Sequence, residues 1–211
     1  MKGKLVVFEG VEGCGKTSQI QLTQEWLQSL KTSVVVTRQP GGTELGLYVR
    51  KLLLEVGSHS IANTTELLLY AADRSQHVEE VIKPSLSEGA IVLCDRYTHS
   101  TIAYQGWGRG LDMNLIHQLN TIATSGLESD LTLWFDVDIE VGLARKQRGG
   151  NMLDRIEKET IAFHRRVQQG YTHLADSYPE QIVRVDASLS QEAVQQKIRA
   201  TLTAKLKAWV D

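Results

Sequence analysis

Residues 5–17 read LVVFEGVEGCGKT, and this stretch decides the fold. It opens with an unbroken apolar run, which is typical of a strand buried on both faces of a parallel sheet. Residues 10–17 then match the phosphate-binding pattern G-x-x-x-x-G-K-[ST]. The loop lies between a strand and a helical pattern, which is the context that its chemistry requires. The alternative is a glycine-rich turn that merely joins a strand to a helix.

The residue types of this loop suit a nucleoside triphosphate. Glycines allow backbone N–H groups to converge on phosphate oxygens, and the N-terminus of the following helix adds positive potential. Lys16 would reach the β- and γ-phosphates, and Thr17 would ligate Mg²⁺. We therefore predict that ATP is bound by Gly10, Val11, Glu12, Gly13, Cys14, Gly15, Lys16 and Thr17.

Four later apolar runs repeat the strand pattern, at residues 34–36, 91–94, 131–135 and 182–185. Helical patterns separate these runs, and such alternation is typical of a parallel sheet with helices on both faces. The sequence therefore predicts an α/β fold, the three-layer P-loop NTPase architecture with a five-stranded parallel sheet flanked by helices. Ligands of such sheets collect outside the carboxyl ends of the strands, so functional residues should follow the apolar runs.

Local patterns give more detailed expectations for the helices. Leu22, Trp26 and Leu30 recur at intervals of four and predict one buried stripe. Long helical stretches are expected at residues 66–86 and 154–178, and a final helix is expected after a capping box from Ser188 to Gln191.

The bulk composition is that of an ordinary globular chain. Of the 211 residues, 42% are hydrophobic and 23% are charged, with a formal net charge of −2, so we expect one domain over residues 1–211. Such a balance does not favour a nucleic acid polymer as partner. A phosphate-bearing ligand would have to be held by a local basic cluster in a cleft, which predicts a small molecule as the target.

The sequence also bears on the compartment. Cys14 and Cys94 form no Cys-x-x-Cys pair and no disulfide framework. The first apolar run is too short for a signal peptide, and no stretch approaches the roughly 18 apolar residues of a membrane span. We therefore expect a cytoplasmic protein without a membrane partner.

Acidic and basic residues follow the apolar runs. Asp95 ends the third run, where P-loop enzymes place the acidic residue that holds or orients Mg²⁺; the alternative is that it caps the next helix. Arginines also recur near loops, at Arg38, Arg74, Arg96, Arg145, Arg148 and Arg155. Their positions after strands and near glycines indicate a second phosphate site, although surface arginines can also serve solubility alone. The guanine-reading N-K-x-D pattern of GTPases is absent.

Six ordered motifs carry a family resemblance over nearly the whole chain. They are FEGVEGCGKT at residues 8–17, TRQPGGT at 37–43, ADR at 72–74, DRY at 95–97, AYQG at 103–106 and LDRIE at 153–157. On these motifs the sequence resembles the bacterial thymidylate kinase family. The resemblance implies phosphoryl transfer from ATP to dTMP, with Mg²⁺ as cofactor, in a homodimer to which the helix at residues 66–86 could supply an interface.

The resemblance also implies residue roles on the acceptor side. Tyr70 matches the aromatic residue that stacks on thymine, with a core tyrosine as the alternative, and Arg74 matches the arginine that hydrogen-bonds the base. Arg38 and Arg96 match arginines beside the acceptor phosphate, where a fork of donors suits phosphate oxygens. The full set of substrate-binding residues implied is Glu12, Arg38, Tyr70, Arg74, Arg96, Thr101, Tyr104 and Gln105.

Residues 145–155 resemble the mobile lid of the family. The P-loop carries no basic residue between Gly10 and Gly15, and in family members of this kind the lid supplies the catalytic arginine. A flexible surface loop without this role is the alternative. The predicted catalytic residues are Lys16, Arg96, Arg145, Arg148 and Arg155. Two departures from the family pattern are Gln39, where glutamate is usual, and Cys14, where alanine is usual.

Two rival classes remain open at this point. A deoxynucleoside kinase would need a carboxylate base for a sugar hydroxyl, and Glu9 or Glu12 could serve. A nucleotide-dependent switch would hydrolyse ATP without an acceptor. No histidine reads as a catalytic base, and His99, which is close to a motif, is expected at the surface.

Overall fold

A five-stranded parallel sheet is the framework of the computed structural model, which describes residues 3–56, 60–148 and 154–210; the side chains of residues 147, 148 and 210 lie outside that description. The strands are β1 (Lys4–Gly10), β2 (Val34–Arg38), β3 (Ile91–Asp95), β4 (Leu131–Asp136) and β5 (Ile182–Asp186). Their order in the sheet is β2-β3-β1-β4-β5, and all neighbours are parallel. The predicted strands and fold class are confirmed.

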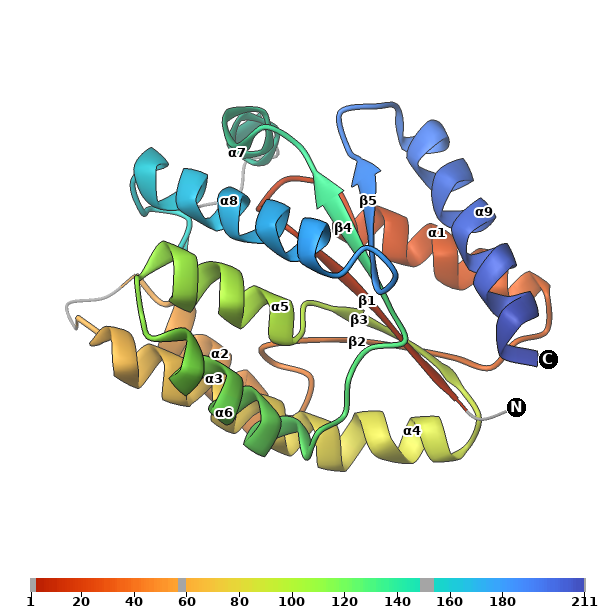
Figure 1. The fold of residues 1–211 in the computed structure, drawn as a ribbon, viewed down its shortest axis with the longest axis horizontal. Coiled ribbons are helices and arrows are strands. Elements are labelled where there is room, and N and C mark those ends of the chain that lie inside the picture. The colour runs from red at the N-terminus through yellow and green to blue at the C-terminus, as the bar shows by residue number, and fades with distance from the viewer. Residues whose placement is uncertain (1–2, 57–59, 149–153, 211) are drawn as a thin grey trace.

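Helices cover both faces of this sheet (Figure 1). They are α1 (Lys16–Ser29), α2 (Glu44–Leu54), α3 (Asn63–His77), the π-helical turn η1 (Val78–Ile82), α4 (Lys83–Ser87), α5 (Thr98–Thr101), the π-helical turn η2 (Ile102–Gly108), α6 (Met113–Thr124), α7 (Ile139–Arg148), α8 (Ile161–Ser177) and α9 (Gln191–Val210). In Figure 1, α1 and α9 lie together on one side of the sheet, and α3 and α4 lie on the other. Across the described ranges, no helix is long and apolar enough to cross a membrane.

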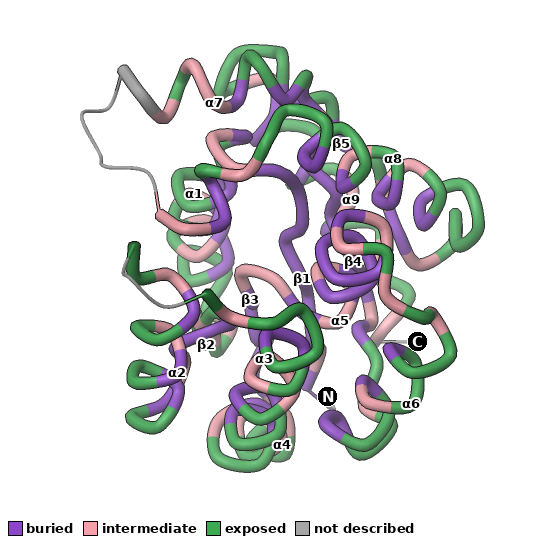
Figure 2. The backbone as a smooth tube through the Cα atoms, turned by 90° about the vertical axis from the view of Figure 1, so that its left-hand side faces the viewer, coloured by how far each residue is buried: buried purple, intermediate pink, exposed green. Residues whose placement is uncertain are grey.

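The central strand β1 is buried on both faces, as its unbroken apolar run predicts. Val6 and Phe8 belong to the larger hydrophobic cluster, whereas Leu5 and Val7 belong to a smaller cluster with residues of η1. Figure 2 shows this buried strand in the middle of the molecule, with exposed residues on the outer faces of α2 and α7. Because β1 is fixed from both sides, the loop that follows it starts from a rigid base.

The run at residues 34–36 is not buried as expected. Val34 and Val35 are only half-buried, and Val36 is 41% exposed. The reason is position in the sheet: β2 is an edge strand that pairs with β3 alone. Apolar composition does not distinguish such an edge strand from a central one.

The buried stripe of α1 also differs from the prediction. Leu30 is 53% exposed and Leu22 and Trp26 are only half-buried, whereas Ile20 and Leu27 are in the core. Polar Thr23 lies on the buried face because its hydroxyl donates to Gln195 Oε1 of α9 at 3.4 Å. The sequence pattern failed here because the stripe includes polar residues that pair with a second helix.

Helix boundaries differ from expectation at two places. The stretch at residues 66–86 is confirmed as helical from α3 through α4. The other long stretch is helical only from Ile161, because Thr160 Oγ1 caps α8 by accepting from Phe163 N, and residues 155–158 form turns. The cap of α9 is Ser190, which accepts from Ala193 N; Ser188 instead donates to Asp186. The predicted capping box is therefore wrong by two residues.

Candidate active site

The phosphate-binding loop lies between β1 and α1, and close backbone contact with α7 fixes its shape. Gly13 has a φ of +70°, and a Cβ there would meet Gly142 O at 1.9 Å. Gly142 on α7 is constrained in turn, because its Cβ would meet Glu12 O at 2.4 Å. Only glycine tolerates both the left-handed conformation and this approach. The loop thus packs directly on the helix that leads into the predicted lid.

Lys16 is held inside the loop rather than extended into solvent. Its ammonium donates to Gly10 O at 3.0 Å and Val11 O at 3.2 Å, and it lies 3.5 Å from Cys14 Sγ. The side chain is buried. The loop therefore presents one fixed cation at the start of α1, where the helix N-terminus also favours anions.

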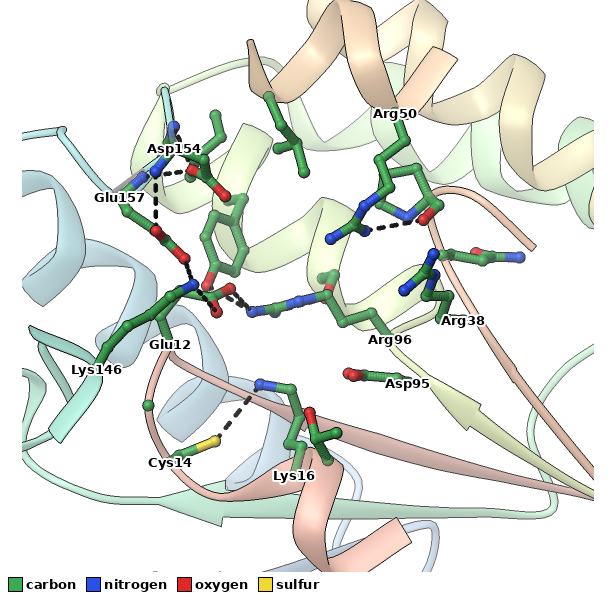
Figure 3. A pocket seen from close by; sticks show the side chains of 18 of the residues that line it. Glu12, Cys14, Lys16, Arg38, Arg50, Asp95, Arg96, Lys146, Asp154 and Glu157 are labelled. Carbon is green, nitrogen blue, oxygen red and sulfur yellow. Dashed lines mark hydrogen bonds and ion pairs between the residues drawn. The ribbon is translucent and has the colours of Figure 1, made fainter. Parts of the chain in front are cut away.

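A cleft of about 480 Å³ opens over the carboxyl ends of β1, β2 and β3 (Figure 3). A volume of this size suits a small-molecule site. The predicted residues that line it are Glu12, Gly13, Cys14, Gly15, Lys16, Thr17, Arg38, Tyr70, Arg74, Asp95, Arg96, Thr101, Tyr104, Gln105 and Arg145. Figure 3 shows Arg38 and Arg50 on one side, Arg96 extended across the middle toward Glu12, and Asp95 below Arg96 and beside Lys16.

A chain of alternating charges crosses the cleft. Glu157 pairs with Lys146, Lys146 Nζ lies 3.8 Å from Glu12 Oε2, and Glu12 pairs with Arg96. Burial alone would raise the pKa of Glu12, but Arg96, Lys16 and Lys146 outweigh it and hold that pKa at about 2. Glu12 is therefore an anion at neutral pH, and it links the P-loop to α7 and to the end of β3.

Arg96 is the most constrained residue of the site. Its backbone is left-handed, with a φ of 70°, which is unusual for a residue that is not glycine. Besides Glu12, its guanidinium donates to Ser100 Oγ at 3.2 Å, Tyr104 Oη at 3.2 Å and Tyr171 Oη at 3.3 Å. A half-buried arginine with this many acceptors is fixed in direction before any ligand arrives.

Glu9 holds Ser100 and Tyr171, two of the acceptors of Arg96, and both of its carboxylate oxygens are hydrogen-bonded. Its two oxygens accept from the backbone of Tyr97 and Ser100 and from the hydroxyls of Ser100 and Tyr171, at 2.6–3.1 Å. The carboxylate is completely buried. It orders the chain that follows β3 and has no free lone pair that faces the cleft.

Asp95 fits the predicted metal role better than the capping alternative. Its Oδ1 is buried and has no hydrogen-bond partner within the part of the chain that the structure describes. The helix α5 begins three residues later, at Thr98, with Tyr97 as its N-cap and without a side-chain cap. An unpaired carboxylate oxygen beside the P-loop suits a hard cation. No group of three or more metal-ligating side chains occurs among the described residues, so phosphate oxygens would have to complete such a site.

The predicted lid is only partly within the described residues. Arg145 lines the cleft and donates to Ala187 O at 2.8 Å. Arg155 instead pairs with Glu66 at 2.5 Å and donates to Leu53 O at 2.7 Å, which directs it toward α2 and α3. The side chain of Arg148 and residues 149–153 lie outside the described residues.

Residues 154–157, the described part of the motif at 153–157, form a reciprocal turn. Asp154 Oδ1 accepts from Glu157 N at 2.9 Å, and Glu157 Oε2 accepts from Asp154 N at 2.9 Å. This is capping-box geometry, and it aims the other oxygen of Glu157 at Lys146.

Several site residues were missed in the sequence. Arg50 on α2 lines the cleft and donates to Pro40 O at 2.9 Å, and Lys146 and Glu157 complete the charge chain. Lys146 stands among the lid arginines, so its basic neighbourhood was a usable signal. Arg50 carries no comparable signal, because it reaches the cleft only through the folding of α2.

The surface position expected for His99 is wrong. His99 is buried, and burial lowers its pKa; its Nδ1 lies 3.3 Å from Thr132 Oγ1. His99 lies on α5, which packs against the sheet. This buried position agrees with the interpretation that His99 is not a catalytic base.

The fold and the cleft together define a P-loop phosphotransferase, with one lysine on the donor side and a group of arginines for a second anion. Residues 8–198 match the model of the family described as thymidylate kinase. The chain belongs to the thymidylate kinase family, whose members are ATP-dependent nucleoside monophosphate kinases.

Relatives and a solved structure agree with this assignment. The thymidylate kinase of Nostoc punctiforme is 70% identical over 98% of this chain and 99% of that protein. The thymidylate kinase of Geotalea uraniireducens is 45% identical over 97% of this chain and 98% of that protein. A solved structure of thymidylate kinase from Ehrlichia chaffeensis is 32% identical, with a TM-score of 0.79, and the match covers 96% of this chain and 100% of that one.

The Glu12 ion pair predicts a distinct pH dependence of stability. Because the folded pKa is about 2 and the ordinary value is 4.5, its contribution is complete above pH 4.5 and is lost as pH falls toward 2. Between pH 6.5 and 3.5, the unaltered chain should lose about 1.4 kcal/mol more unfolding free energy than Glu12→Gln. Urea unfolding at each pH measures this difference.

The matched control is Glu140→Gln, which removes an exposed ion pair with Arg165. An exposed pair contributes roughly 0–1 kcal/mol, so we expect its pH profile to follow that of the unaltered chain. Parallel profiles for Glu12→Gln and the unaltered chain would show that Glu12 is not held ionised by Arg96.

Proposed function

We propose that the chain transfers the γ-phosphoryl group of ATP to dTMP, which yields dTDP and ADP as a step of dTTP synthesis. One observation carries this proposal: Lys16 and several arginines line the same cleft, in a chain that belongs to the thymidylate kinase family. The two sides of the cleft suit a donor and an acceptor that both carry phosphate.

The donor side consists of the P-loop, residues 10–17. Its backbone N–H groups and Lys16 would bind the β- and γ-phosphates. Thr17 and the unpaired oxygen of Asp95 would hold Mg²⁺, which supplies charge neutralisation on the phosphates when it is bound. Gly10 and Val11 contribute to the loop through the carbonyl oxygens that hold Lys16.

The acceptor side is suited to a phosphate dianion. The second pKa of a phosphate monoester is about 6, so its oxygen is already a nucleophile near pH 7 and needs no general base. Arg38 and Arg96 would hold this phosphate in line, and Arg50 adds a third cation to the same side of the cleft.

The base and the sugar would lie toward α3 and η2. Tyr70 and Arg74 line this part of the cleft one helical turn apart, and Thr101 accepts from Arg74 at 2.7 Å. We assign Tyr70 to stacking on thymine and Arg74 to hydrogen bonding with it. Tyr104 would limit the space beside the sugar, and Gln105, held by Glu66 at 2.9 Å, would line the base.

The geometry disfavours a nucleoside kinase. Such an enzyme needs a carboxylate base for a sugar hydroxyl. Glu9 is buried with both oxygens engaged, and Glu12 has a pKa of about 2 because of its cationic neighbours, so neither carboxylate is a suitable base. A phosphorylated acceptor avoids this requirement.

The experiment that tests the function is phosphoryl transfer from ATP-Mg²⁺ to a panel of monophosphates: dTMP, dUMP, dCMP, AMP and GMP. Unphosphorylated thymidine and a reaction without acceptor are the controls. We expect dTDP as the main product and slow ATP hydrolysis without acceptor, because an open site would waste ATP. Preference for thymidine itself would indicate a deoxynucleoside kinase instead, and fast ATP hydrolysis without acceptor would indicate a nucleotide-dependent switch.

We also propose that residues 145–155 act as a lid within one catalytic domain over residues 1–211, and that Arg145 or Arg148 supplies the catalytic cation. The P-loop has no arginine, whereas Arg145 reaches the cleft from α7. The catalytic role of Arg155 stays a prediction, and its pairing with Glu66 suits an anchor for the lid.

The lid proposal predicts a large loss of kcat. A well-placed arginine contributes roughly 10³- to 10⁵-fold in rate, so at least one of Arg145→Ala and Arg148→Ala should lower kcat by more than about 100-fold. The control is Arg165→Ala, an arginine on α8 whose partner is the exposed Glu140. Changes in kcat of only a few-fold for both lid variants would exclude this role.

We further propose a homodimer in the cytoplasm, assembled through α2, α3 and α6. Leu45, Tyr48 and Leu52 are at least half exposed and share one face of α2. Leu68 on α3 and Ile122 on α6 extend this apolar surface, and α3 packs against both neighbouring helices. A contiguous apolar face of this kind is typical of an interface between copies.

The dimer proposal predicts the mass of the protein in solution and a decrease of that mass in one variant. Sedimentation velocity should give twice the chain mass for the unaltered protein, and Leu52→Glu should shift it toward the monomer because a charge enters the apolar face. The control Leu30→Glu places the same charge at an exposed leucine of α1, away from this face. A monomeric unaltered chain would refute the assembly.

A further inference from the structure

Arg74 is a buried cation that no carboxylate neutralises directly. It is 2% exposed, and its guanidinium donates to Gln39 Oε1 at 2.8 Å, Thr101 Oγ1 at 2.7 Å, Asn120 Oδ1 at 2.7 Å and Tyr97 O at 2.9 Å. All four acceptors are neutral, and none of the ion pairs among the described residues includes Arg74. The carboxylates of Glu9 and Asp73 act on it only through space. Burial without a direct salt bridge is unusual, because buried charges are normally paired.

Gln39 connects this arginine to a second buried polar group. Its Oε1 accepts from Arg74 Nε, and its Nε2 lies 2.9 Å from His77 Nδ1. A guanidinium can only donate, so the carbonyl end of the amide must face Arg74 and the NH₂ end must face His77. The amide orientation is therefore determined by chemistry.

The same reasoning assigns the tautomer of His77. Because the Gln39 NH₂ group donates, Nδ1 must be the unprotonated acceptor, and the proton of the neutral ring lies on Nε2. Nε2 then donates to Thr37 Oγ1, which lies 2.6 Å away. The ring is fixed between two residues that flank the end of β2.

The surroundings keep His77 uncharged. The ring is completely buried, and burial together with Arg74 lowers its pKa to about 4, against a smaller opposite effect of Glu80. The other polar groups that face the ring are neutral Thr37 and Gln39. At neutral pH the hydrogen-bonded series of side chains Thr37–His77–Gln39 thus carries no charge.

We propose that Gln39 and His77 form an uncharged relay that fixes the direction of the Arg74 guanidinium and leaves it without a hydrogen-bonded counterion, so that its positive charge acts on the acceptor nucleotide. Gln39 and His77 are positioning residues in this account, and residue 39 determines how strongly the acceptor is held. The inference rests on the proposed function, since it assigns Arg74 to the acceptor side.

The isosteric change Gln39→Glu separates charge from shape. A carboxylate can still accept from Arg74, but it has no proton to donate to His77 Nδ1. The contact is kept if His77 carries a proton on Nδ1, either by a change of neutral tautomer, with the Thr37 hydroxyl then donating to Nε2, or by uptake of a second proton. In both cases the new carboxylate is a direct counterion to Arg74 at neutral pH.

The first readout is acceptor affinity in the full chain. We expect Gln39→Glu to raise KM for dTMP by about tenfold while kcat changes by less than about threefold, because ground-state and transition-state binding weaken together. His77→Leu should also raise this KM, whereas His77→Asn, which keeps an acceptor near the Nδ1 position, should restore it. The control Gln28→Glu adds the same charge at an exposed site of α1 and should leave both constants unchanged.

The second readout is the protonation of His77, which does not depend on activity. NMR of the ring nitrogens should show neutral His77 with its proton on Nε2 from pH 8 to 5.5 in the unaltered chain. In Gln39→Glu, we expect a proton on Nδ1 within this range, whether the ring changes tautomer or becomes charged. Thermal unfolding of each variant identifies any that fails to fold, and the NMR titration of the unaltered chain needs no variant.

The outcomes distinguish this inference from the proposed function. Unchanged KM in Gln39→Glu, or a charged His77 in the unaltered chain at pH 7, would overturn the relay even if dTMP is the acceptor. Failure of the unaltered chain to phosphorylate dTMP would refute the function, and the tautomer of His77 would then still decide whether the relay exists.

Discussion

The ion pair between Glu12 and Arg96 is the constraint on which the cleft depends, because it joins the P-loop to the end of β3 at the middle of the sheet. Arg96 adopts a left-handed backbone to reach this partner, and Glu9 stabilises the segment after it through four hydrogen bonds. The strain and the half-buried charges are tolerated because both are compensated locally. This side of the cleft, to which we assign the acceptor, is consequently built in advance, as preorganised electrostatic catalysis requires.

Net charge and local charge have separate functions in this chain. The formal net charge is −2, yet the cleft gathers Lys16, Lys146 and several arginines. Two anionic nucleotides must approach each other there, and fixed cations lower the repulsion between them. Two arginines that we assign to the acceptor side are held by different means: Arg96 has a carboxylate partner, whereas the hydrogen-bond acceptors of Arg74 are all neutral. This difference suits a phosphate contact for the first and a contact with a neutral base for the second.

The sequence predicted those features that local chemistry specifies by itself. The P-loop, the five strands and most cleft residues were readable because glycine spacing and apolar runs report directly on backbone geometry. The exposure of Val36, the buried stripe of α1 and the burial of His99 were missed, because each depends on which element packs alongside. Gln39 was visible only as a departure from a family pattern, and its contact with His77 joins residues 38 positions apart. Long-range pairing of this kind leaves no trace in one sequence.

The most direct measurement is a crystal structure of the full chain with dTMP, ADP and Mg²⁺. We expect the dTMP phosphate against Arg38 and Arg96, with thymine between Tyr70 and Arg74 and the metal near Thr17 and Asp95. We also expect Arg74 to keep its contact with Gln39 in the complex. A dTMP molecule bound outside this cleft, or bound with its phosphate directed toward Arg74 and its base toward Arg96, would contradict the assignment of the two sides.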